Sequence, residues 1–324
     1  MLEILAITGP IYIAIALGYT SVRFGLFGRD DTRVLAKFVL NFALPALLFH
    51  ALAQRRLDEV LNVSYLLAYA VGSFTLMGLI VLYARWRQRK TRSSSSYFAM
   101  GMTCSNSGYM GYPIVVLTLG PVAAVVLALN MLVENLFKLP TLMAYAETDP
   151  AQDGERRSMA AVLRLMAVRL LTNPMILGIL AGTLVALLGW TLPAVVQRTV
   201  ALFAQASGPV ALFVIGGSLV GLQLRGMRSE MAQILAGKLL LHPLFVWLAV
   251  SLLPWVGMTE LDPQMKTAAV LSAAMPMLGI YPLLAQRHGR GEVAAAALLA
   301  TTVASFLTIS GLLWLMRHAS GWLG

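Results

Sequence analysis

Charged residues are scarce in this sequence: they make up 12% of its 324 residues, whereas hydrophobic residues make up 59%. Soluble domains contain about 25% charged and about 45–50% apolar residues. A chain with so little charge cannot cover its apolar surface when it folds in water. Apolar runs of about 20 residues, long enough to cross a hydrocarbon core about 30 Å thick, recur along the whole sequence. We therefore expect an all-α polytopic membrane protein.

Cysteine is almost absent as well. The single Cys104 excludes a disulfide within the chain and fits no multi-cysteine metal site. The four histidines are scattered, and the sequence has no His-Glu-x-x-His and no paired catalytic aspartate motif, which argues against an intramembrane protease or lipid-modifying transferase. No ring of like charges or filter-like repeat favours a channel. We expect no enzyme activity, no cofactor and no metal site.

The net charge of +10 does not indicate a nucleic-acid partner, because no basic stretch is interleaved with aromatic residues. The basic residues border hydrophobic spans instead. Most of the 24 Lys and Arg residues fall in the connections after the odd-numbered spans. Lys238 is counted with the connection after the seventh span. The positive-inside rule places these connections in the cytoplasm. We expect a protein of the plasma (inner) membrane whose termini both face the outer, periplasmic side.

Hydropathy predicts ten transmembrane spans. They cover residues 4–22, 34–52, 64–84, 97–119, 122–143, 168–188, 200–220, 235–253, 265–285 and 293–315. We therefore expect the lipid bilayer to surround this chain as its main partner, and we expect no soluble domain.

Proline spacing suggests an internal repeat. Pro45 and Pro209 lie 164 residues apart, each in the second span of its half, and Pro113 and Pro276 lie 163 apart, each in the fourth span. Because five spans per half is an odd number, the second half must start on the opposite side of the membrane. The expected architecture is an inverted 5+5 repeat, with residues 1–150 and 151–324 as its two halves.

Helix-breaking residues interrupt the fourth and ninth spans. The fourth contains "CSNSGYMGYP" (104–113) and the ninth "AAMPMLGIYP" (273–282). Pro113 removes a helical N–H and is suited to open a second half-helix, while Gly108 and Gly111 permit an unwound segment. The alternative is that these prolines only kink two helices. Two interruptions at matching positions instead favour the binding site of a transporter.

If the two interrupted spans cross at the membrane midplane, two half-helix N-termini meet there. Each carries about half a positive charge, so the site would favour an anion. The polar residues beside the interruptions would supply neutral donors. The candidate substrate-binding residues are Asn41, Ser105, Asn106, Gly108, Gly111, Pro113, Met275, Pro276 and Met277.

The fifth span carries Asn130, Glu134 and Lys138 at spacings of four, which places all three on one helix face. Ionisable residues inside a membrane are costly and usually functional. In one interpretation they form a support site where a proton or cation is coupled to the substrate. In the other, Lys138 snorkels to the cytoplasmic end and Glu134 only neutralises it. His242, beside Pro243 at the start of the eighth span, is interpreted as structural.

These motifs resemble the auxin efflux carrier family, which includes plant auxin carriers and bacterial transporters such as the malonate carriers. "SNSGYMGYP" is similar to the family's Asn-x-x-x-Met-Gly-x-Pro crossover, with Asn106, Met110, Gly111 and Pro113 in place. The resemblance extends over nearly the whole chain. Its other motifs are "LNFALPALLFHAL", "TNPMILGILAG", "ALFVIGGSLVGLQ", "MPMLGIYPLLAQRHG" and "AAALLATTVASFLTIS".

The resemblance implies a crossover of spans four and nine, scaffold and transport domains that move like an elevator, and small organic anions as substrates. The chain departs from the plant carriers at Met277, where they have Gln, and it lacks their long central loop, so a small carboxylate such as malonate is expected rather than auxin. Export or uniport, or a proton-linked cycle, is favoured. A Na⁺-coupled organic-anion symporter of similar fold is the alternative, and a homodimer stays open.

Overall fold

The structure of the protein is a computed structural model. It describes residues 2–54, 62–149, 168, 171–221, 228–286 and 290–318. Within these ranges every regular element is helical. The first part of the chain forms α1 (Leu2–Arg23), α2 (Arg29–Phe38), α3 (Leu44–Ala53), α5 (Val63–Trp86), α6 (Arg92–Thr103), α7 (Tyr112–Leu119), α8 (Val122–Leu132) and α9 (Leu139–Glu147). The boundary expected between two repeats, at residues 150 and 151, lies outside the described residues.

The second part of the chain is helical in the same way. It forms α11 (Pro174–Leu188), α12 (Ala194–Ser218), α13 (Arg228–Ala236), α14 (His242–Leu252), α15 (Pro263–Ala274), α16 (Tyr281–Gln286) and α17 (Gly291–His318). A short 3₁₀ helix, Leu253–Val256, follows α14.

In the part of the chain that the structure describes, six helices are long and apolar enough to cross a membrane. They are Asp30–Ala53, Val63–Trp86, Val122–Glu147, Ala194–Ser218, Ser229–Val256 and Gly291–Met316, and two shorter apolar helices cover Ser107–Leu119 and Pro174–Leu188. This arrangement is consistent with the polytopic membrane protein that the composition predicts. Each of the six overlaps an expected span.

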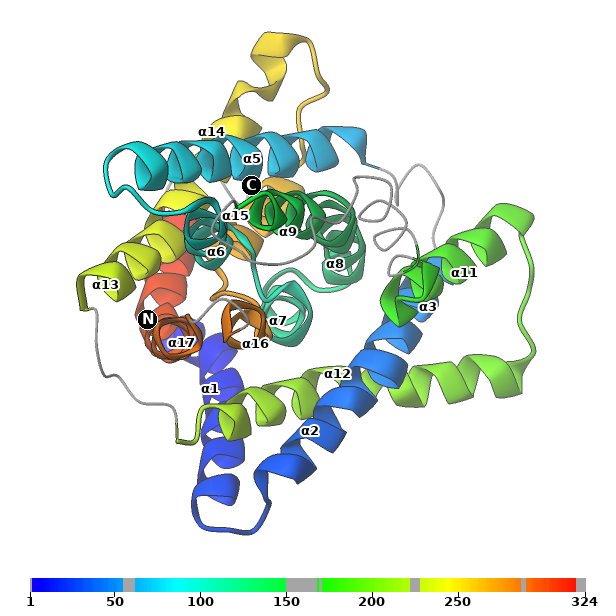
Figure 1. Cartoon of the computed structure of the whole chain (residues 1–324). Coiled ribbons are helices and arrows are strands. Elements are labelled where there is room, and N and C mark those ends of the chain that lie inside the picture. Colours follow the sequence, from blue (N-terminus) through cyan, green and yellow to red (C-terminus); the bar gives the residue numbers. More distant parts are fainter. Residues whose placement is uncertain are drawn as a thin grey trace.

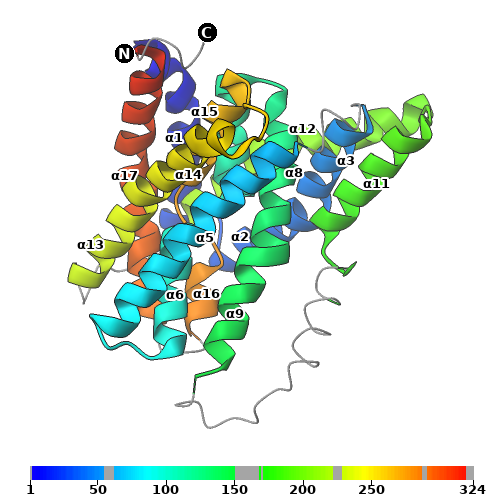
Figure 2. The same ribbon diagram turned by 90° about the horizontal axis from the view of Figure 1, so that it is seen from above.

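The helices pack in two groups (Figures 1 and 2). In one group α12 runs across α1, α2 and α3, and α11 lies against α3. In the other, α5 packs on α6 and α14, α9 on α6, and α16 on α17. Contacts of α3 with α8 and of α12 with the segment before α7 join the two groups. Both groups therefore contain helices from both halves of the sequence.

Close helix packing in the first group depends on glycine. A Cβ added at Gly216 of α12 would overlap the carbonyl oxygen of Ile15 in α1, and one added at Gly18 of α1 would overlap that of Phe213 in α12. Lipid tails are as apolar as leucine, so association of membrane helices relies on van der Waals contact that small residues permit. Gly18 and Gly216 thus let the backbones of α1 and α12 touch.

Four π-helical turns precede proline residues in the same way. The turns Val39–Ala43, Ser107–Gly111, Val133–Lys138 and Gly237–Leu241 are each followed by one residue and then by a proline, namely Pro45, Pro113, Pro140 and Pro243. In each case the residue before the proline donates its N–H to the carbonyl five positions earlier. A wider turn before each proline accommodates the ring and the missing N–H.

The equal spacing of Pro113 and Pro276 does not reflect equal positions in the structure. Pro276 lies in the non-helical segment directly after α15, whereas Pro113 lies in the first turn of α7. The expectation that Pro113 opens the second half-helix was wrong, because helical structure resumes at Ser107. In the ninth span, Pro282 occupies the corresponding place near the start of α16.

Candidate functional site

The two interrupted segments pair with each other through their backbones. α6 ends at Thr103 and α15 at Ala274, and the next residues, Cys104 and Met275, are extended. Ser105 and Met277 then form an isolated antiparallel bridge. Asn106 N–H donates to the carbonyl of Pro276 at 2.8 Å. Backbone that leaves the helix inside a membrane needs such partners, because no water is there to replace them.

Asn106 caps the helical segment that follows the fourth-span interruption. Its side-chain oxygen accepts from Tyr109 N–H at 3.2 Å, so its amide nitrogen is the group left for a ligand. The N–H groups of Ser107 and Gly108 have no acceptor in the part of the chain that the structure describes. A half-helix N-terminus with orphan donors suits an anion.

A cavity of about 590 Å³ opens at these groups, between the two helix groups. From the interruptions it is lined by Cys104, Ser105, Asn106, Ser107, Gly108, Tyr109, Leu278, Gly279 and Ile280; from the other elements by Ala36, Leu40, Asn41, Leu44, Met131, Glu134, Asn135, Leu139, Asn173, Pro174, Met175, Val214, Ile215 and Ser218. Its size suits a small organic molecule. Most of the lining is apolar, and the polar groups gather at the interruptions.

The structure brings only some of the sequence-predicted residues to this cavity. Asn41, Ser105, Asn106, Gly108 and Glu134 line it. The others lie outside its lining: Gly111, Pro113, Asn130, Lys138, Met275, Pro276 and Met277. The last two hold the backbone pairing described above, and the side chains of Met275 and Met277 belong to the apolar core.

Glu134 forms the centre of a buried polar network beside the cavity. Its Oε1 accepts from Tyr69 Oη at 3.0 Å and from Ser105 N–H at 3.1 Å, and its Oε2 accepts from Ser107 Oγ at 3.3 Å. The carboxylate therefore holds both residues that flank Asn106. A change in its charge would act directly on the interrupted segment.

Lys138 completes this network from one turn further along. Its Nζ lies 3.7 Å from Glu134 Oε1 and donates to the carbonyl of Thr103, the last residue of α6. The side chain is fully buried. The expectation that Lys138 snorkels to an end of its span was wrong, whereas its pairing with Glu134 is present.

Asn130 and Glu134 of the fifth span are each hydrogen-bonded by a tyrosine of α5. Sequence reasoning did not single out these two tyrosines. Tyr65 Oη donates to Asn130 Oδ1 at 3.0 Å, and its ring stacks on that of Tyr69 with centroids 6.2 Å apart. Tyr65 and Tyr69 lie four residues apart, as Asn130 and Glu134 do. This matching spacing on the third and fifth spans was the signal that could have identified them.

Lys238, which sequence reasoning did not single out, lies beside His242, which it interpreted as structural. Lys238 is fully buried in the π-helical turn Gly237–Leu241, so its assignment to a cytoplasmic connection was wrong. Its Nζ donates to Ser105 Oγ at 2.9 Å and to the carbonyl of Ala273 at 2.7 Å. Nδ1 of His242 lies 2.9 Å from the same Nζ.

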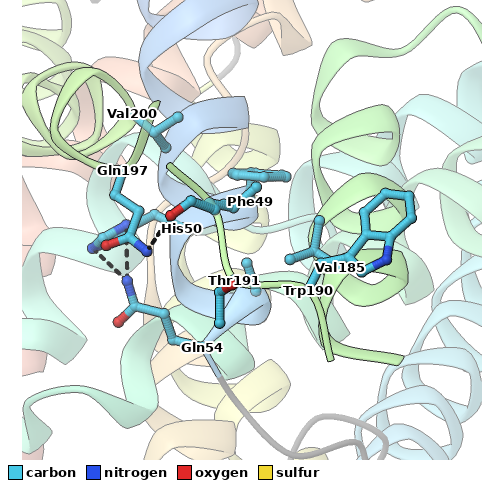
Figure 3. A pocket seen from close by; sticks show the side chains of 10 residues that line it. Phe49, His50, Gln54, Val185, Trp190, Thr191, Gln197 and Val200 are labelled. Atoms are coloured by element: carbon cyan, nitrogen blue, oxygen red, sulfur yellow. Dashed lines mark hydrogen bonds between the residues drawn. The ribbon is translucent and has the colours of Figure 1, made fainter. Parts of the chain in front are cut away.

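A smaller cavity of about 160 Å³ lies apart from this site, between α3, α11 and α12. Figure 3 shows Gln54 facing His50 on its wall, with Gln197 beside His50 and Trp190 on the other side of the view. Gln54 Nε2 lies 3.2 Å from His50 Nδ1. His50 thus bonds to its neighbour on α3 and does not reach the interruptions.

Comparison with known proteins identifies related membrane transporters. A family model described as membrane transport protein matches residues 7–314. A protein of Rhizobium meliloti named putative malonate transporter is 31% identical over 324 residues, which cover 99% of this chain and 98% of that protein.

More distant relatives follow the same pattern. An uncharacterized transporter of Escherichia coli is 25% identical over 94% of this chain and 95% of its own length. Auxin efflux carrier component 8 of Arabidopsis thaliana is 22% identical over 66% of this chain and 71% of that protein. These matches confirm the resemblance that the interrupted-span motifs indicated.

Proposed function

Because this chain belongs to the membrane transport protein family, we propose that it is a secondary transporter of small organic anions, of the carboxylate class. The name of the Rhizobium meliloti relative, putative malonate transporter, supports this substrate class. A chain that carries solutes across a bilayer needs no bond-breaking chemistry, which fits the lack of catalytic motifs in the sequence.

One observation carries the proposal. The side-chain amide of Asn106 meets the N–H groups of Ser107 and Gly108, which find no acceptor among the described residues, at the wall of the 590 Å³ cavity. These are neutral, directional donors of the kind that bind carboxylate oxygens at helix N-termini. The apolar remainder of the cavity suits the short carbon chain of such an anion.

We further propose that the protein works by elevator-like alternating access. In this proposal the group of α1, α2, α3, α11 and α12 is the scaffold, and the other helices form the transport domain that carries the interruptions. Ten spans, arranged as an inverted 5+5 repeat of residues 1–150 and 151–324, would cross the inner membrane with both termini outside. The cavity supports this proposal because Asn41 lines it from one group and Asn106 from the other.

Electrostatics favours export or uniport of the anion. An inside-negative potential helps one negative charge outward by about 2.3 kcal/mol per 100 mV. Glu134 is the one carboxylate that lines the cavity in the described part of the chain, so a proton carried there is the simplest coupled ion. The alternative is Na⁺-coupled symport, which the carbonyl groups of the interruptions would have to support.

The test is a thermal-shift screen of the purified protein against mono- and dicarboxylates, each with and without Na⁺. We expect stabilisation by one or more small carboxylates that does not need Na⁺. Uptake of that carboxylate into proteoliposomes then measures transport. Absence of binding and transport across the whole panel would overturn the proposed function, and a strict requirement for Na⁺ would favour the alternative.

A further inference from the structure

Lys238 holds its ammonium group at the junction of the two interruptions. Ser105 belongs to the fourth-span interruption and lines the cavity, whereas Ala273 lies in the last turn of α15. Lys238 Nζ contacts both at hydrogen-bond distance. One side chain of a third helix therefore ties the two interrupted spans together directly behind the cavity wall.

The contacts of this side chain fit the charged form of lysine. An ammonium has three donors, and three acceptors surround Nζ: Ser105 Oγ at 2.9 Å, Ala273 O at 2.7 Å and His242 Nδ1 at 2.9 Å. His242 Nε2 lies 2.9 Å from Ser73 Oγ, which suits a neutral imidazole that donates from Nε2 and accepts at Nδ1. Nδ1 and Ala273 O, 3.1 Å apart, then both accept from the ammonium.

The buried charges around the interruptions do not balance. Glu134 is paired with Lys138, while Lys238 has no carboxylate within ion-pair distance in the described part of the chain. With Lys238 in its ammonium form, one positive charge is in excess beside the cavity. A buried charge without a counter-charge is expensive, and the partial negative charge at the end of α15 offsets only a fraction of it.

Ser105 connects Lys238 to the cavity through a hydrogen bond. Its Oγ accepts from Lys238 Nζ and lies 3.4 Å from Tyr69 Oη, whose single hydrogen is donated to Glu134 Oε1. While Oγ accepts from the ammonium, the hydroxyl hydrogen of Ser105 can be offered to a ligand in the cavity. An anion in the cavity would accept that hydrogen bond and supply the missing negative charge, whereas a neutral molecule would leave the ammonium uncompensated.

We propose that Lys238 is the specificity-determining residue of this transporter. Its unpaired positive charge, delivered through Ser105, makes the cavity select a carboxylate over a neutral molecule of the same shape. This inference rests on the proposed function and names the residue that sets its charge preference.

The test compares two ligands that differ by one charge. Malonamate carries one carboxylate and malonamide none, and butyrate with butyramide forms a second such pair. Dissociation constants of the purified full chain are measured for each ligand by calorimetry in detergent. In the wild type we expect the carboxylate to bind more tightly than the amide in at least one pair. In Lys238→Gln we expect this ratio to fall at least tenfold.

Damage to packing alone would weaken both members of a pair alike and leave the ratio unchanged. Lys238→Met removes the same charge in case the glutamine variant fails to fold. Ser105→Ala keeps the lysine and removes only the hydroxyl, and we expect it to lower the ratio by a smaller factor. Lys266→Gln removes a partly exposed lysine that is paired with Glu260 and serves as the matched control, with an unchanged ratio.

The outcomes separate the two proposals. A wild type that binds neither these two carboxylates nor any other carboxylate of the thermal-shift panel overturns the proposed function itself. A wild type that prefers the carboxylate, together with Lys238 variants that keep the full preference, overturns the assignment of Lys238. A fall of the ratio in Lys238→Gln or Lys238→Met, but not in Lys266→Gln, supports it.

Discussion

Lys138 and Lys238 place ammonium groups on the carbonyl ends of the two interrupted helices. Lys138 Nζ donates to the carbonyl of Thr103 at the end of α6, and Lys238 Nζ donates to that of Ala273 in the last turn of α15. The carbonyl end of a helix carries a partial negative charge and unsatisfied acceptors. At membrane depth these acceptors have no water, so two lysines from different helices perform the same stabilising task.

The two lysines differ in their counter-charges, and this difference predicts their mutational behaviour. Lys138→Met leaves the Glu134 carboxylate buried without its partner, so we expect a loss of about 3 kcal/mol in unfolding free energy. Adding Glu134→Gln should recover part of this loss, because the uncompensated charge disappears. Thermal unfolding of the two single variants and the double variant in detergent measures the coupling, and strictly additive effects would contradict the prediction.

Asn106 offers a nearly isosteric test of anion binding. Asn106→Asp keeps a side-chain oxygen that can accept from Tyr109 N–H, but it replaces the amide donor by a carboxylate oxygen that repels an anion. We expect carboxylate affinity to fall at least about tenfold, or about 1.4 kcal/mol, while unfolding without ligand changes little. Asn106→Ala should lose both the cap and the affinity. Wild-type affinity in Asn106→Asp would show that the amide does not contact the substrate.

Glu134 is the group through which a proton would be linked to transport. If it carries that proton, uptake into proteoliposomes should rise as the external pH is lowered, because the proton and the anion then enter together. Glu134→Gln should make the rate independent of pH, whereas the exposed Glu260→Gln should keep the wild-type profile. An identical pH profile in Glu134→Gln would assign Glu134 a structural role alone.

The sequence predicted well what depends on local composition. Apolar runs gave the candidate spans, and the glycine and proline content of residues 104–113 and 273–282 located both interruptions. Spacing of four residues predicted that Glu134 and Lys138 would pair. In each case the physical cause lies within one helix, so the pattern of a single segment was sufficient.

Features that depend on contacts between helices could not be predicted from the sequence. Lys238 lies near the start of the expected span 235–253 and was counted with the basic residues before it, because nothing in the local sequence shows which residues of other helices bury it. Its burial depends on Ser105 and Ala273, which lie 133 and 35 residues away. Pro113 and Pro276 occupy different helical positions for the same reason: the position of a proline in a helix depends on where the surrounding backbone finds its partners.

The contact between α1 and α12 yields a prediction about stability. A Cβ at Gly216 would overlap the backbone of Ile15 and Tyr19, which cannot move aside as a flexible side chain could. Gly216→Ala should therefore cost about 1–3 kcal/mol, the usual range for overpacking, and lower the unfolding temperature in detergent.

Gly78 of α5 is the matched control, because an added Cβ there would meet no atom within 4 Å. Gly78→Ala should be neutral or stabilising by about 0.5–1 kcal/mol, since alanine loses less backbone entropy in a helix than glycine. The sign of the effect thus separates helix propensity from helix contact. Equal effects at Gly78 and Gly216 would mean that α1 and α12 do not approach as closely in the membrane as their glycines permit.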